Sequence, residues 1–185
     1  MATTDVSMKT MRGSAIRVAM VSIFSALVFV ASLLNRYTLQ GAQILFAIVY
    51  GSGVLVLGYP GAATSIALIA GSIYMFQSSL GFLILASFGV RGASTDLLFL
   101  ILGIYKDARN GIFKWTKISA ALILSSFLTG LFHYIFFVFI MKKLIDFGAF
   151  IVSAIFITAM LSNGVGGYIV AKYIMPRVSK LGVPI

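Results

Sequence analysis

The sequence predicts an all-α integral membrane protein, a single domain over residues 1–185 in which six transmembrane helices form a bundle with both termini in the cytoplasm. Three observations predict this class. Hydrophobic residues make up 61% of the chain and charged residues only 10%, so lipid must replace water around most of the surface. Six apolar runs approach the roughly 20 residues that a bilayer crossing needs. Lysine and arginine also gather in alternate connections.

Five of the spans follow directly from the apolar runs, at about residues 14–34, 42–58, 61–77, 118–141 and 147–174. Basic residues precede the first run, as in a signal peptide, but no small-residue cleavage pattern follows it, so we expect a retained helix. Tyr59, Pro60 and Gly61 form a tight break between the second and third spans. These two spans are therefore expected to form a helical hairpin.

Two geometries fit the fourth span. A single helix over residues 82–105 would place both Arg91 and Asp96 at membrane depth. Alternatively, residues 77–89 form an apolar loop or half-helix over the outer mouth, and the helix occupies about residues 91–105. Two glycines interrupt the run and favour the second geometry. We therefore expect the fourth helix to begin near Arg91.

Lysine and arginine fall mostly on one side of the predicted membrane, as expected when positive charge in short loops stays in the cytoplasm. With six crossings from a cytoplasmic N-terminus, the basic residues outside or near the outer face are Arg36, Arg91, Lys142 and Lys143. The formal net charge of +10 then reflects this topology and attraction to anionic headgroups. We expect the lipid bilayer as a partner and no nucleic acid.

Small residues at helical spacing form stripes on two spans. The stripe on the first span comprises Ala15, Ala19, Ser22 and Ala26, and the stripe on the third comprises Ala63, Ala67 and Gly71. Helices in lipid associate through small residues that let backbones approach closely. Packing within the chain and docking onto another membrane subunit both fit these stripes, and the sequence does not choose between them.

Asp96 is the polar residue most out of place, because an ionisable group inside a bilayer costs about 2.5 to 3.5 kcal/mol and usually faces a cavity or a partner. It either caps the fourth helix together with the two residues before it, pairs with Arg91, or contacts a ligand. His133 and Asn163 are likewise either interhelical hydrogen-bond partners or ligand contacts. Since these residues lie on three late helices, they are candidates to line one pocket.

Motifs for catalysis and metal binding are missing from the sequence. It has no cysteine, no glutamate, no HExxH, no P-loop and no catalytic Ser/His/Asp order. We therefore expect no enzymatic activity, no metal and no cofactor. The remaining aspartates, Asp5, Asp107 and Asp146, are interpreted as solvated charges. A secondary transporter usually carries more intramembrane ionisable groups and a repeat between halves, and neither is found.

Three stretches resemble a known family: "AIRVAMVSIFSALVFVASLL" after a basic N-terminus, the "GYPGAATSIALIAGSIY" hairpin, and the closing "LSNGVGGYIVAKYIMPRVSKLG". With about 185 residues and six spans, the chain resembles the substrate-binding S components of energy-coupling factor (ECF) vitamin transporters. The resemblance implies a multi-pass protein of a prokaryotic cytoplasmic membrane that captures a vitamin or a metal at its outer face. It also implies docking through the first-span stripe to a transmembrane coupling protein that binds two ATPases.

The resemblance places the pocket near the outer surface. The substrate-binding residues that it implies are Arg36, Tyr37, Gln40, Tyr74, Gln77, Arg91, Asp96, His133, Tyr134 and Asn163. Acidic, histidine and asparagine residues on the fourth, fifth and sixth helices are similar to the thiamine-specific members, in which a carboxylate suits a cationic ring. The lone Trp115 lies in a cytoplasmic loop, away from such a site. The expected solute is thiamine, its pyrimidine precursor or another small vitamin; the alternative is a structural or assembly subunit without a ligand.

Overall fold

Helices make up all the regular structure in the part of the chain that the computed structural model describes, residues 2–38 and 41–180, with side chains from residue 15 onward. The helices are α1 (Ala2–Tyr37), α2 (Gln43–Leu57), α3 (Ala62–Met75), α4 (Phe82–Ile101), α5 (Ile104–Arg109), α6 (Trp115–Ile135), α7 (Phe147–Ile151), α8 (Ala154–Ile169) and α9 (Met175–Lys180). Two π-helical turns, η1 (Phe136–Ile140) and η2 (Val170–Ile174), continue α6 and α8.

Four helical segments are long and apolar enough to cross a membrane. They are Ala15–Tyr37, Phe82–Ile101, Trp115–Ile140 and Ala154–Lys180. At 1.5 Å per residue, the 15 residues of α2 and the 14 of α3 reach only about 21 to 23 Å, against a hydrocarbon core of about 30 Å. The fold therefore confirms a multi-pass helical membrane protein, while the count of six crossings stays a prediction.

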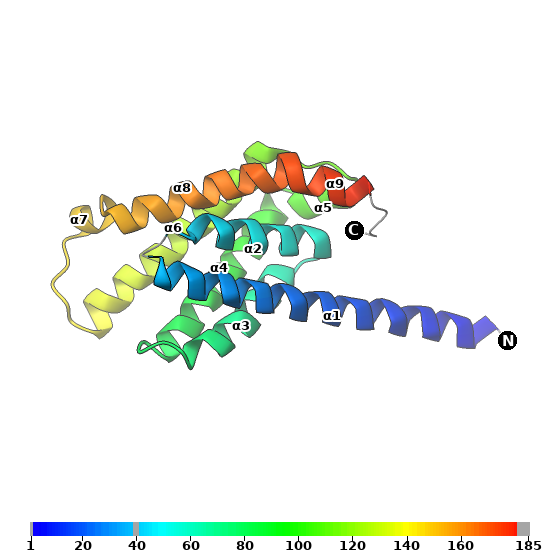
Figure 1. Cartoon of the computed structure of the whole chain (residues 1–185), viewed down its shortest axis with the longest axis horizontal. Coiled ribbons are helices and arrows are strands. Elements are labelled where there is room, and N and C mark those ends of the chain that lie inside the picture. Colours follow the sequence, from blue (N-terminus) through cyan, green and yellow to red (C-terminus); the bar gives the residue numbers. More distant parts are fainter. Residues whose placement is uncertain (1, 39–40, 181–185) are drawn as a thin grey trace.

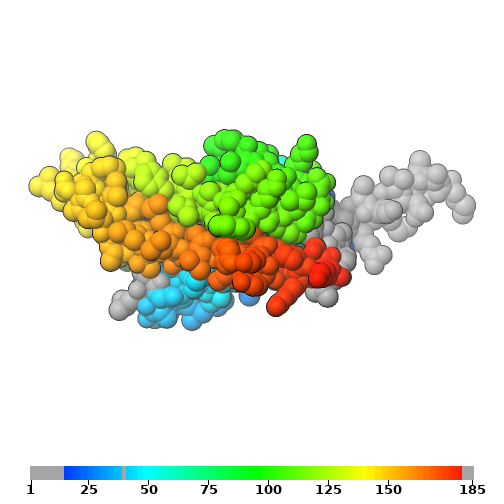
Figure 2. Space-filling model, turned by 90° about the horizontal axis from the view of Figure 1, so that it is seen from above, coloured from blue at the N-terminus to red at the C-terminus, as the bar shows by residue number. Residues whose placement is uncertain are grey.

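Helices α1, α2 and α8 run roughly along the long axis of the molecule, and α4 and α6 run obliquely to them (Figure 1). Helix α3 packs against α1 and α4, α6 packs against α4 and α8, and α2 packs against α1 and α8. In the view of Figure 2 the continuous rod of α8, η2 and α9, orange to red, lies between cyan α2 and yellow-green α6. The start of α1 and helix α9 lie at the same end of the bundle, and the connection into α7 lies at the other end (Figure 1).

The break between α2 and α3 confirms the expected hairpin. Gly58 ends α2 at φ 61°, and Gly61 precedes α3 at φ 93°. Glycine adopts such left-handed conformations without the steric cost of a side chain. The Gly58 amide also donates to the Val54 carbonyl, which closes the last turn of α2. Four residues therefore suffice to reverse the chain between two apolar helices.

The expected start of the fourth helix near Arg91 is wrong. Helix α4 begins at Phe82, so Arg91 and Asp96 lie well inside one continuous helix. The glycines that suggested an interruption serve packing instead. A Cβ atom on Gly92 would lie 2.6 Å from the Thr64 Cα, so this glycine lets α4 approach the backbone of α3. The end of α4 is set by Gly103 at φ 67°.

Candidate functional site

Two adjoining cavities open where α1 ends and α2 begins. Their volumes are about 290 and 640 Å³. Small-molecule sites typically have volumes of roughly 300 to 1,000 Å³, so the smaller cavity lies at the lower limit of this range and the larger one within it. Both are lined by Asn35, Gln43, Arg91, Thr129 and His133. The smaller cavity adds Ser32, Phe46, Tyr74, Ile84, Ser87 and Phe88, and the larger adds residues of α6 and α8 that include Ser126, Gly130, Phe156 and Ala159. The site therefore joins polar groups and aromatic rings from seven α-helices.

Arg91 is the charged residue in the lining of both cavities, and its side chain is buried, with 5% exposed. One guanidinium nitrogen, Nη2, donates to Asn163 Oδ1. The guanidinium carbon lies 5.7 Å from the ring centres of Phe46 and Tyr50, within the range of cation–π attraction. Nε has no hydrogen-bond partner among the described residues. Two aromatic rings and an asparagine thus hold a permanently charged group beside a cavity.

The backbone around Arg91 is fixed by hydroxyl groups of α4 and α6. The Arg91 carbonyl accepts from Thr95 Oγ1 at 2.8 Å and from Ser125 Oγ at 3.1 Å. Ser125 Oγ also lies 2.9 Å from Ser94 Oγ, which joins the two helices a second time. In an apolar surrounding these buried hydroxyls satisfy one another. The position of Arg91 along the bundle is therefore set by contacts between helices.

Asn163 lies behind the arginine, fully buried on α8. Its Nδ2 donates to the Ala159 carbonyl at 2.7 Å and to Ser126 Oγ at 3.3 Å, which directs Oδ1 toward Arg91. The expected close approach at this cluster is also confirmed. A Cβ atom on Gly166 would lie 2.6 Å from Ala47 Cβ, and one on Gly167 2.9 Å from Ser119 Cα. Asn163 therefore positions Arg91, with its own hydrogen bonds satisfied inside the bundle.

His133 lines both cavities, but both ring nitrogens have partners within the protein. Nδ1 lies 3.1 Å from the Thr129 carbonyl, and Nε2 lies 2.9 Å from Ser87 Oγ on α4. Because a carbonyl only accepts, Nδ1 carries the hydrogen in this arrangement. The hydrogen bond to Ser87 joins α6 to α4. The interpretation of His133 as an interhelical partner is thus supported, and its ring still borders the cavity.

Asp96 points to a different part of the protein. Its carboxylate accepts from the amide of Ala63 at 3.2 Å, from the amide and hydroxyl of Thr64 at 2.9 and 2.5 Å, and from the hydroxyl of Tyr105. The amides belong to the first turn of α3, so Asp96 caps α3, where a negative charge also meets the positive end of the helix dipole. Burial and the nearby carboxylate raise the pKa of Tyr105, which keeps the phenol protonated as a donor.

Two of the three alternatives considered for Asp96 are therefore wrong. The residue does not cap the start of its own helix, since α4 begins fourteen positions earlier at Phe82. It also forms no ion pair with Arg91, whose partner is Asn163. Asp96 is not in the lining of either cavity. The sequence pattern correctly indicated a cap, but the capped helix is a neighbour that lies 32 residues back along the chain.

The other predicted binding residues are spread over the same end of the bundle. Tyr74 lines the smaller cavity. Exposed Arg36 donates to the backbone carbonyl of Gln77, and Tyr37 is 79% exposed. The Tyr134 hydroxyl donates to the Ile145 carbonyl at 3.3 Å. Gln40 lies outside the described residues. Of this group, the structure brings only Tyr74 together with Arg91 and His133.

Several lining residues were not predicted. The uncharged polar ones are Ser32, Asn35, Gln43, Ser87, Ser126, Thr129 and Ser153. Helical spacing contains a signal for some of them, because Ser126, Thr129 and His133 follow at intervals of three and four, and Ser87 precedes Arg91 by four. A search for polar residues on the same helix faces as Arg91 and His133 would therefore have found Ser87, Ser126 and Thr129.

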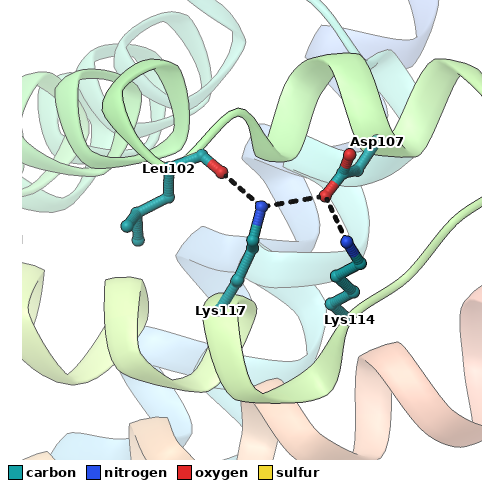
Figure 3. A network of polar contacts seen from close by, with 4 residues as sticks. All are labelled: Leu102, Asp107, Lys114 and Lys117. Carbon is teal, nitrogen blue, oxygen red and sulfur yellow. Dashed lines mark hydrogen bonds and ion pairs between the residues drawn. The ribbon is translucent and has the colours of Figure 1, made fainter.

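Asp107 lies at the opposite end of the bundle. We predicted a solvated charge there, but its carboxylate is paired with two lysines. Lys117 Nζ donates to Asp107 Oδ2 at 3.1 Å and to the Leu102 carbonyl at 2.9 Å, and Lys114 Nζ lies 3.9 Å from the same carboxylate oxygen (Figure 3). The three polar contacts join the connection after α4 to the first turn of α6. Asp146 is exposed as expected and accepts from the Ala149 amide at 2.8 Å.

The two small-residue stripes differ in burial. On α3, Ala63, Ala67 and Gly71 are buried, so packing within the chain explains that stripe. On α1, all four members are exposed: Ala15, Ala19, Ser22 and Ala26. Packing within the chain therefore does not explain the α1 stripe.

The class that fold and site define is a multi-pass helical membrane protein with a polar and aromatic cavity at one end of its bundle. Comparison with protein-family models, with curated proteins and with solved structures found no match for the chain. Among the described residues no group of three acidic or histidine side chains is arranged to hold a metal ion.

Proposed function

We propose that the chain is the solute-capturing S subunit of an ECF-type, ATP-driven importer in a prokaryotic cytoplasmic membrane. The observation that carries this proposal is the cavity around Arg91 and His133, to which seven α-helices contribute polar groups and aromatic rings. Its depth among apolar helices suits capture of one small solute away from water. In this role the chain binds the solute and hydrolyses nothing itself.

The exposed stripe on α1 supports the assignment of partners. Small residues let a second helix approach closely in lipid, and Ala15, Ala19, Ser22 and Ala26 are all exposed. In the proposed complex this stripe contacts a transmembrane coupling protein that binds two cytoplasmic ATPases. ATP hydrolysis in those partners then drives release of the captured solute to the cytoplasm.

The proposed solute is a small water-soluble vitamin or a precursor of one. Thiamine and its pyrimidine precursor stay a prediction, but the carboxylate expected to contact a cationic ring, Asp96, has all its observed hydrogen bonds at α3 and Tyr105. The same contacts favour the second candidate function, a structural or assembly subunit, because they give Asp96 a purely structural role. The unpartnered polar atoms at the cavity favour capture over that alternative.

The experiment that tests the proposal is purification of the tagged chain from membranes of its source organism, with an Ala19→Leu variant and a control variant, Ala120→Leu, at an exposed position of α6 that should behave as wild type. Wild type is expected to carry a coupling protein and two ATPases and to support ATP-dependent uptake. Ala19→Leu is expected to lose both while folding normally, because Ala19 is exposed. Purification of the wild-type chain without ATPase subunits contradicts the proposal.

A further inference from the structure

We propose that Arg91 binds a carboxylate group of the captured solute, so that the substrate class is a small organic acid rather than a cation. This inference rests on the proposed capture function and specifies the ligand of the same cavity. It rests on three features: the charge of Arg91, its guanidinium nitrogen Nε, which lacks a hydrogen-bond partner, and a second unpartnered atom on Asn35.

The first feature is an uncompensated buried charge. An arginine side chain stays protonated in proteins, and burial of a charge is unfavourable unless an opposite charge accompanies it. The described acidic side chains are engaged elsewhere: Asp96 at the start of α3, Asp107 with two lysines, and Asp146 at the start of α7. Among the residues with described side chains, no carboxylate therefore balances Arg91. A bound anion supplies the missing charge.

The second feature is the geometry of the guanidinium group. Phe46 and Tyr50 each lie 5.7 Å from its carbon, and Asn163 takes one hydrogen of Nη2. Nε remains without a partner, although the arginine lines both cavities. A carboxylate matches the fork of N–H groups on a guanidinium and accepts two parallel hydrogen bonds from it. The protein thus fixes the plane of the group and leaves the Nε donor for a planar acceptor.

The third feature specifies what lies beside the carboxylate. Asn35 donates through Nδ2 to Gln43 Oε1 at 2.7 Å, while its buried Oδ1 accepts no hydrogen bond. Asn35 lines both cavities together with Arg91. A buried acceptor without a partner is unfavourable, so the ligand is expected to present a hydroxyl or N–H donor to it. One arginine also balances one negative charge, which favours a monocarboxylate over a phosphate ester.

The test compares acids with uncharged counterparts of nearly the same shape. The detergent-purified full chain is titrated with pantothenate and panthenol, nicotinate and nicotinamide, and biotin and biotin amide, while thermal unfolding is recorded. Thiamine serves as the cationic probe. We expect at least one acid to raise the unfolding temperature and to bind at least tenfold more tightly than its uncharged counterpart. Arg91→Gln is expected to abolish this difference, and Arg177→Gln, at an exposed position of α9, to preserve it.

The proposal is overturned if no acid binds better than its counterpart, if thiamine is the compound that binds, or if Arg91→Gln binds the acid within twofold of wild type. If Arg91→Gln does not fold, the comparison of acid with counterpart on the wild-type chain decides alone. Binding of thiamine or a neutral compound leaves the capture function in place and removes only the carboxylate. Loss of the capture function itself is recognised separately, by purification without coupling protein and ATPases.

Discussion

Replacement of Asp96 by asparagine is expected to destabilise the bundle rather than to remove a ligand contact. One carboxylate oxygen accepts from the Ala63 amide and the Tyr105 hydroxyl, and the other accepts from the amide and hydroxyl of Thr64. Asparagine keeps one oxygen and turns an NH₂ group toward the two remaining donors. One buried backbone amide then loses its acceptor, whereas the hydroxyl beside it can turn and accept from the NH₂ group, so the free energy of unfolding should fall by about 1 to 3 kcal/mol.

The assay is unfolding of the detergent-purified protein in the absence of any solute, followed by helix content during an SDS titration. Tyr105→Phe removes one of the four donors without stranding another, and it should cost only about 1 kcal/mol. Asp146→Asn is the matched control, since its single amide contact lies at the exposed start of the short helix α7. Unfolding of Asp96→Asn at the wild-type SDS concentration, together with loss of solute binding, would refute the assignment of Asp96 as a cap.

Three further predictions concern packing and surface contacts. Gly92→Ala should destabilise the protein by about 1 to 3 kcal/mol in the same assay, because the new methyl group overlaps α3. Gly89→Ala should change stability little, since the nearest neighbour of its new methyl group is 3.4 Å away. Equal effects of the two substitutions would contradict the close approach of α4 to α3. Lys117→Met should cost about 1 kcal/mol and the more exposed Lys114→Met less than about 0.5 kcal/mol, and the reverse order would be inconsistent with the contacts in Figure 3. Ala19→Leu should leave the unfolding profile unchanged while complex formation is lost, and a stability loss would indicate packing within the chain.

The class of fold was accessible from the sequence because lipid demands long apolar helices, and the α2–α3 hairpin because glycine and proline mark a reversal. The start of α4 was not, since a glycine that breaks a helix and a glycine that admits a neighbouring backbone look identical in sequence. Gly92 is of the second kind, as its distance to Thr64 demonstrates. That distinction depends on which helices are neighbours, which one sequence does not reveal.

The candidate site was predicted in part. Arg91 and His133 stood out because ionisable groups in an apolar run are costly, and both line the cavities. Asp96 stood out for the same reason, but its partner is a helix that begins 34 residues earlier, at Ala62, and no local pattern indicates such a contact. Asn35 and Thr129 are uncharged and lie among many similar residues. Their role follows from shared helix faces and became visible only when the helices were assembled.

The central claim is that the cavity around Arg91 holds a solute, and native mass spectrometry of the gently extracted protein tests it most directly. Thr129 lines both cavities, so Thr129→Phe should fill them, while Thr158→Phe places the same ring at an exposed position of α8. Wild type and Thr158→Phe are expected to retain one bound small molecule, and Thr129→Phe is expected to lose it while staying folded. Wild type without any bound molecule, or the same occupancy in Thr129→Phe, would contradict the claim.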